Sequence, residues 1–222
     1  MKTAMLLFPG FTVLDAIGPY HALASLPGWD FTFVAERAGP VSNGGSFTME
    51  APVGIDEVGQ PDLLVVPGGV AAIELARSGG VLIDWIREVH PGTTWTTSVC
   101  TGALMLGAAG VLQGLPATTH WYCHAELATF GAIPTDARVV RSGKVMTAAG
   151  VSAGIDMSLE LTALIAGEAY AQAAQLDMEY DPQPPFHSGH PRSAPPEVYA
   201  WLKGMYDGML DPAGSAEQAD GD

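Results

Sequence analysis

Short apolar, β-branched runs alternate with segments of helical spacing along most of the chain, and this alternation is the strongest constraint on its fold. Strands that alternate with helices build a parallel sheet that is covered by helices on both faces. The sequence therefore predicts the α/β class, with a three-layer sandwich around a mostly parallel sheet. The strands expected in this sheet are Ala4–Phe8, Phe31–Ala35, Leu63–Val66 and Thr94–Val99.

Two hairpins are expected beside these strands, because Val41–Ala51 and Val139–Thr147 each contain a glycine turn between apolar runs. The length of 222 residues fits one domain, which we place at residues 1–210. Within it, residues 181–196 are rich in Pro, Ser and His and predict a surface arm. The acidic residues 211–222 predict a disordered tail. The helices expected are Ile83–Val89, Ile155–Ile165, Glu168–Tyr180 and Val198–Leu210.

Charge and hydropathy narrow the range of partners. The chain has 24 acidic and 9 basic residues, a net charge of −15, whereas binding of nucleic acid needs clustered Lys and Arg. No apolar run reaches the roughly 18 residues that span a bilayer, and Pro9 interrupts the short apolar start before a secretory signal could form. Two cysteines, Cys100 and Cys123, make no disulfide framework. We expect a cytoplasmic protein with neither a nucleic-acid nor a membrane partner.

The segment WTTSVCTGALMLGAAGVL carries the strongest chemical signal, because Cys100 stands where a strand turns directly into a helix. Such a strand–Cys–helix nucleophile elbow exposes its turn residue at the carboxyl edge of a sheet, where open α/β folds bind ligands. The amides at the helix N-terminus also favour a thiolate. The alternative is a small cysteine that only fills the core. The pattern alone leaves both open.

Two further segments bear on this choice. In VVPGG, free N–H groups of Gly68 and Gly69 are expected to form one side of an oxyanion-type pocket, with the N–H of Thr101 on the other; a plain strand–helix turn is the alternative. Asp15 stands among apolar residues soon after the first strand, where a carboxylate needs a partner or a function. It could instead cap a helix that starts at Ala16.

These motifs give the chain a family resemblance. The segments LLFPGFTVLDAIGP, VVPGG, SVCTGALMLGAAGVLQG, ATTHW and AAGVSAGIDMSLEL, with the later LDMEYDPQPPF, resemble in this order the ThiJ/PfpI branch of the class I glutamine amidotransferase-like superfamily. The combination of Asp15 with Cys100 and Thr101 resembles the residue pattern of those family members that hydrate isonitriles. Many other members have Glu in place of Asp15, and many peptidase-like members have His directly after the cysteine.

The resemblance implies a flavodoxin-like sandwich, a homodimer and the conversion of an isonitrile, R–N≡C, and water into an N-substituted formamide. The apolar segment from Ala16 to Leu26 is where we expect the dimer contact. The resemblance also places His120 of ATTHW near the pocket and matches Val151 to a pocket-lining position. No cofactor and no metal are expected. A satisfied structural histidine is the alternative for His120.

Two histidines, the second cysteine and one further aspartate also invite chemical interpretations. His120 and His124 have the i,i+4 spacing of zinc ligands on a helix, but the Glu of an HExxH motif is missing. Cys123 is most simply a packed thiol, and Asp156 is expected to cap or brace a helix.

The chemistry expected from these residues uses Cys100 as nucleophile and Asp15 as proton carrier. The Cys100 thiolate attacks the terminal carbon of the isonitrile while Asp15 delivers a proton, which gives a thioimidate. The Asp15 carboxylate then activates water, and collapse releases the formamide. Donors from Gly69 and Thr101 position the substrate or the water.

Other functions on the same site stay open. One is a related glyoxalase-like or amidase-type cysteine hydrolase. Another is a ligand-sensing module of the kind that precedes DNA-binding helices in some regulators, although this chain shows no basic extension of that kind. A further one is a redox sensor in which Cys100 is oxidised.

Overall fold

The computed structural model describes residues 1–24, 26 and 28–210, which fall into two compact units. The first unit, Met1–Tyr180, contains the sheet and its helices. The second begins at Asp181, where the sequence predicts the proline-rich arm. The prediction of one domain over residues 1–210 stays a prediction. The segment 211–222, for which we predict disorder, lies outside the described residues.

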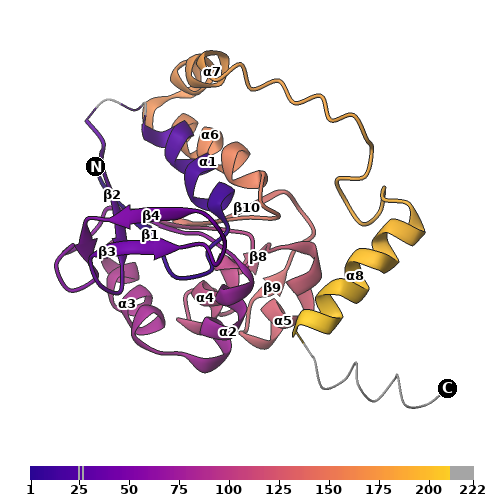
Figure 1. Cartoon of the computed structure of the whole chain (residues 1–222). Helices are drawn as coiled ribbons and strands as arrows, with labels where there is room; N and C mark the ends of the chain where they lie inside the picture. Colours follow the sequence, from indigo (N-terminus) through magenta and orange to yellow (C-terminus); the bar gives the residue numbers. More distant parts are fainter. Residues whose placement is uncertain (25, 27, 211–222) are drawn as a thin grey trace. The chain divides into compact units, whose positions relative to one another are not determined.

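A seven-stranded sheet forms the middle layer of the first unit (Figure 1). Its order is β10–β11–β7–β6–β1–β2–β5, and neighbouring strands are parallel except for the antiparallel pair β10 and β11. Smaller sheets join β3 to β4 and β8 to β9. The strands are β1 (Lys2–Leu6), β2 (Asp30–Ala35), β3 (Gly39–Ser42), β4 (Thr48–Ala51), β5 (Val53–Gly54), β6 (Leu63–Val66), β7 (Trp95–Val99), β8 (Pro116–Ala117), β9 (Ile133–Pro134), β10 (Val139–Ser142) and β11 (Val145–Ala148).

Helices cover both faces of this sheet. Figure 1 shows α1, α6 and α7 on one side and α2, α3, α4 and α5 on the other, which confirms the predicted three-layer α/β sandwich. The helices of this unit are α1 (Val13–Ala24), α2 (Val70–Ser78), α3 (Val81–Val89), α4 (Gly102–Ala108), α5 (His124–Thr129), α6 (Ala153–Ala166) and α7 (Glu168–Asp177).

The central strands are buried along most of their length because helices cover them from both sides. All residues of β6 are buried, as are the last four of β7. The expected strands and both hairpins are found close to their predicted places, the hairpins as β3–β4 and β10–β11. Among the described residues, no helix has the length and apolar character that crossing a membrane requires.

The second unit contains one helix, α8 (Pro196–Leu210), within its described residues 181–210. The arm before it has turns and bends but neither helix nor strand. No residue of α8 is buried, and Trp201 is 71% exposed. The predicted helix Val198–Leu210 is therefore present, with its apolar side chains exposed to solvent.

Candidate active site

Cys100 occupies the turn between β7 and α4. Its φ of 57° lies in the left-handed region, which non-glycine residues rarely adopt, and the residue is only 5% exposed. Its N–H donates to the carbonyl oxygens of Ala148 (3.0 Å) and Ala149 (2.8 Å), at the end of the neighbouring strand β11. The strand–Cys–helix elbow is thus confirmed in its geometry, and the role of Cys100 as nucleophile stays a prediction.

Asp15 lies beside this cysteine and is completely buried. Its Oδ2 accepts a hydrogen bond of 2.9 Å from the N–H of Gly68, and the neighbouring Cys100 side chain lowers the pKa of the carboxyl group. Oδ1 has no hydrogen-bond partner within the described part of the chain. The alternative of a helix cap is wrong, because α1 begins at Val13 and Asp15 lies inside its first turn.

The two glycines after β6 hold the site together but do not offer free donors, so that part of the prediction is wrong. The N–H of Gly68 is engaged by Asp15, and the N–H of Gly69 donates to Thr101 Oγ1 at 2.8 Å. The Thr101 hydroxyl in turn donates to the carbonyl of Gly69, also at 2.8 Å. The reason is that β6 and β7 are neighbours, so the turn after one strand meets the turn after the other.

Burial sets the protonation of the pair. It raises the pKa of Asp15 from 3.8 to about 7, although the Gly68 N–H and Cys100 oppose the shift. Burial, and then the Asp15 charge, raise the pKa of the Cys100 thiol well above its usual value, against the Thr101 N–H and hydroxyl. Burial therefore acts against the thiolate that the helix N-terminus is predicted to favour, at the start of a helix of only seven residues.

Both groups of the pair consequently hold their protons more tightly than the free side chains do. Near neutral pH the thiol of Cys100 is protonated, while Asp15 is close to half ionised, because its pKa is about 7. An ionised Asp15 next to a protonated thiol can take the thiol proton directly. The arrangement can therefore generate a nucleophile at the moment of reaction and carry one proton to a bound molecule.

His120 and Val151 lie on segments that border the elbow. A Cβ atom built on Gly150 would be 3.5 Å from His120 Cδ2, so the ring faces the turn 150–152 that contains the half-buried Val151. Burial, and then His124, lower the pKa of His120 to about 4. His120 is therefore neutral at pH 7, which favours a structural or hydrogen-bonding role over acid catalysis.

The two histidines do not form a metal site. The ring Nε2 of His124 lies 3.3 Å from the carbonyl oxygen of Thr119, and His124 starts α5. Within the described ranges, His, Cys, Asp and Glu side chains do not gather into any group of three or more that could hold a metal ion.

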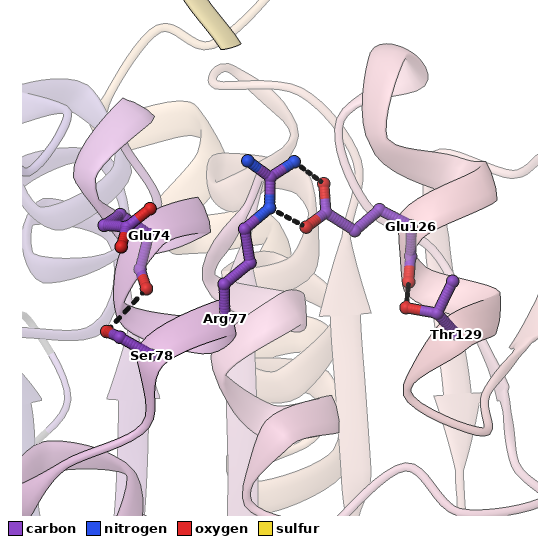
Figure 2. A network of polar contacts seen from close by, with 5 residues as sticks. All are labelled: Glu74, Arg77, Ser78, Glu126 and Thr129. Atoms are coloured by element: carbon purple, nitrogen blue, oxygen red, sulfur yellow. Dashed lines mark hydrogen bonds and ion pairs between the residues drawn. The ribbon is translucent and has the colours of Figure 1, made fainter. Parts of the chain in front are cut away.

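Cys123 lies near an ion pair that joins two helices around the site. Arg77 of α2 donates from Nε and from a terminal guanidinium nitrogen to both carboxylate oxygens of Glu126 of α5, at 2.7 and 3.0 Å (Figure 2). Burial, and then Glu126, raise the pKa of the Cys123 thiol to about 12. This thiol stays protonated, which fits the prediction of a packed cysteine.

Asp156 braces its own helix α6 against the residues before β10 and after α7, as expected. It accepts hydrogen bonds from Arg138 Nε and, at 3.0 Å, from the Tyr180 hydroxyl, and Arg138 also donates to Ser152 Oγ at 3.2 Å. The sequence analysis missed Arg138 and Tyr180 as its partners. It also missed Thr119, whose hydroxyl donates to the carbonyl of Cys100 at 2.9 Å. Thr119 lies inside the ATTHW motif, and its place beside His120 in that motif could have indicated that it lies near the site.

Comparisons with known proteins match most of the chain. Residues 1–164 match the DJ-1/PfpI family. The isonitrile hydratase of Pseudomonas putida is 42% identical over 198 residues, which cover 89% of this chain and 86% of that protein. The crystal structure of a ThiJ/PfpI family protein from Pseudomonas syringae superposes with a TM-score of 0.88 at 39% identity, over 92% of this chain and 85% of that one.

A relative of another kind also matches. The HTH-type transcriptional regulator CdhR of Pseudomonas aeruginosa is 26% identical over 167 residues, which are 71% of this chain and 48% of the regulator.

The space at Gly68 gives a direct test of the site's packing. A Cβ atom at this position would lie 2.6 Å from Thr101 N, 2.7 Å from Thr101 Oγ1 and 2.9 Å from Asp15 Oδ2. We expect Gly68→Ala to lower the free energy of unfolding by about 1–3 kcal/mol, the usual cost of overpacking. Urea unfolding measures the change. Gly45→Ala, where the nearest atom is the flexible Asn43 side chain at 3.4 Å, is the matched control and should change little. Equal stability of the two variants would contradict this packing.

Proposed function

The chain belongs to the DJ-1/PfpI family, and on this premise we propose that it hydrates isonitriles to N-substituted formamides, with Cys100 as nucleophile and Asp15 as proton carrier. The observation that carries the proposal is the buried contact between a protonated thiol and a carboxyl group with a pKa of about 7. The similarity to the isonitrile hydratase of Pseudomonas putida supports the choice of substrate.

The first step forms a thioimidate. The terminal carbon of R–N≡C carries a lone pair and becomes electrophilic once it is protonated. Asp15 takes the proton of the Cys100 thiol and delivers it to this carbon, while the sulfur forms a bond to the same carbon. The product is R–N=CH–S–Cys100, and Asp15 is a carboxylate again. The step uses the single proton that the pair holds when Asp15 is ionised.

The second step releases the formamide. The Asp15 carboxylate takes a proton from water, the oxygen bonds to the thioimidate carbon, and Asp15 passes the proton to the nitrogen. The tetrahedral adduct then collapses: its hydroxyl proton leaves, a C=O bond forms and the C–S bond breaks. R–NH–CHO departs, and the proton returns to the Cys100 sulfur. The net reaction adds one water without a change in electron count, so the proposal includes no cofactor.

Thr101 supports this cycle in a narrower way than we expected. Its N–H lowers the pKa of the Cys100 thiol and so stabilises the developing thiolate. Its hydroxyl is already held by the backbone of Gly69. The proposed role of Thr101 is therefore to stabilise the sulfur when the proton leaves, and that of Gly68 and Gly69 is to hold Asp15 and Thr101 in place.

The other functions have less support. A redox sensor needs a thiolate, whereas the pKa of Cys100 is raised. A Cys–His hydrolase dyad at adjacent positions is absent, because Thr101 follows Cys100. The match to the regulator CdhR covers 48% of that protein, and DNA binding of the whole regulator does not transfer to this chain.

We also propose that the protein forms a homodimer and resides in the cytoplasm. Within the described residues both cysteines are free, as in a reducing compartment. The expected dimer contact on the segment from Ala16 to Leu26 stays a prediction: Ala16, Ala22 and Leu23 are buried in the chain's own core, whereas Tyr20 of the same helix is 37% exposed. The homodimer is proposed from the family and from this segment, and light scattering that shows a monomer at micromolar concentration would contradict it.

Turnover of an aryl isonitrile by the purified protein tests the activity, with the formamide measured by chromatography. We expect Cys100→Ala to abolish formation of the formamide and Cys100→Ser nearly to do so, because a serine hydroxyl stays protonated. Cys123→Ser is the control, and it should keep most of the activity. Wild-type rates in the Ala variant would remove Cys100 from the mechanism.

Asp15→Asn separates catalysis from stability. Burial raises the pKa of Asp15 from 3.8 in the unfolded chain to about 7 in the folded protein, so the folded state binds this proton more tightly. The wild type therefore loses stability as the pH rises from 3.8 to about 7, and this group causes no further loss above pH 7. The Asn variant lacks this loss. We expect it to be more stable than the wild type at pH 8 by up to roughly 4 kcal/mol, with the difference vanishing near pH 4. Its rate should fall by orders of magnitude.

The pH profile of the wild type completes this test. Its kcat/KM should fall below pH about 7, since a protonated Asp15 cannot take the thiol proton. Asp15→Glu keeps the carboxyl group but moves it by one methylene, and should reduce activity without abolishing it. An Asn variant with unchanged rate and unchanged stability at pH 8 would refute the role of Asp15.

A further inference from the structure

We propose that Thr119 is a positioning residue, whose hydroxyl holds the carbonyl of Cys100 and thereby keeps the thiol in contact with Asp15. The expected effect on turnover rests on the proposed function. The hydrogen bond between Thr119 and Cys100 does not depend on that function. Thr119 Oγ1 donates to the Cys100 carbonyl at 2.9 Å, and both residues are buried.

The elbow needs such support. Cys100 has a φ of 57°, a conformation that side-chain-bearing residues adopt only where their surroundings enforce it. The Cys100 N–H is fixed by the carbonyls of Ala148 and Ala149. Its carbonyl accepts from Ala103 N–H at 3.3 Å, which is long, and from the Thr119 hydroxyl at 2.9 Å. Thr119 therefore provides the shorter of these two restraints on the orientation of the peptide that follows Cys100.

Thr119 is itself held on both sides. The preceding residue, Thr118, donates its N–H to Thr147 Oγ1 of β11 at 2.9 Å. The carbonyl of Thr119 faces His124 Nε2 at 3.3 Å. The Thr119 hydroxyl therefore belongs to a segment that is bound to β11 and to the start of α5. Because this segment is held in place, its hydrogen bond can fix the position of the Cys100 carbonyl.

The chain offers a matched control one residue away. Thr118 and Thr119 are both completely buried, but within the described residues Thr118 Oγ1 has no hydrogen-bond partner. Thr119→Val and Thr118→Val therefore make the same change in shape and hydropathy, and only the first removes a bond to Cys100. Thr119→Ser keeps the hydroxyl and should restore most of the function.

We expect Thr119→Val to lower kcat for an aryl isonitrile about tenfold to a hundredfold with little change in KM, because a misplaced nucleophile slows the chemical step more than it weakens binding. Thr118→Val should stay within about threefold of the wild type, as no positioning contact is lost. An equal loss in both variants, or none in Thr119→Val, would overturn the proposal.

A second measurement does not depend on the substrate. The Cys100 contact lowers the pKa of Asp15, so a thiol displaced in Thr119→Val should let that pKa rise. Carbon-13 NMR of labelled aspartate, with the Asp15 signal assigned by Asp15→Asn, follows this titration. The pKa should rise in Thr119→Val and stay constant in Thr118→Val and Thr119→Ser. If even the wild type makes no formamide, the proposed function fails while this titration still decides the role of Thr119.

Discussion

The burial of the Asp15 carboxyl group against the Cys100 thiol is the constraint on which the rest of the site depends. A carboxylate without water is costly, and the Gly68 N–H is the backbone donor that offsets part of this cost. The carboxyl group comes from the first turn of α1, which follows β1, the thiol from the turn after β7, and the donor from the turn after β6. These three strands are neighbours in the sheet, so the sheet order itself brings the groups together.

This environment distinguishes the site from cysteine enzymes that keep a ready thiolate. Here burial raises the pKa of both groups, so that near neutral pH the thiol keeps its proton and Asp15 is only about half ionised. Such a site suits a substrate that accepts a proton at the atom that the sulfur attacks. An isonitrile carbon has this property, which links the electrostatics of the buried pair to the proposed reaction.

The sequence predicts the local features of this fold well, because strands, hairpins and the elbow follow from short patterns such as VVPGG and TTSVC. It fails where partners are distant along the chain. The amide of Gly68 is bound by a residue 53 positions away and that of Gly69 by one 32 positions away, so neither could be known to be occupied. The raised pKa of Cys100 escaped prediction for the same reason, since desolvation depends on the packing of the whole sheet.

Gly69 is a position where intolerance to substitution would not indicate a chemical role. A Cβ atom there would lie 2.3 Å from the carbonyl oxygen of Gly10, so the turns after β1 and β6 approach each other as closely as bare backbone permits. A scan of all substitutions would therefore rank Gly69 among the least tolerant positions, although it has no side chain to react. Intolerance alone would mark it as part of the chemistry, whereas its contribution is to leave space for the residues that carry it out.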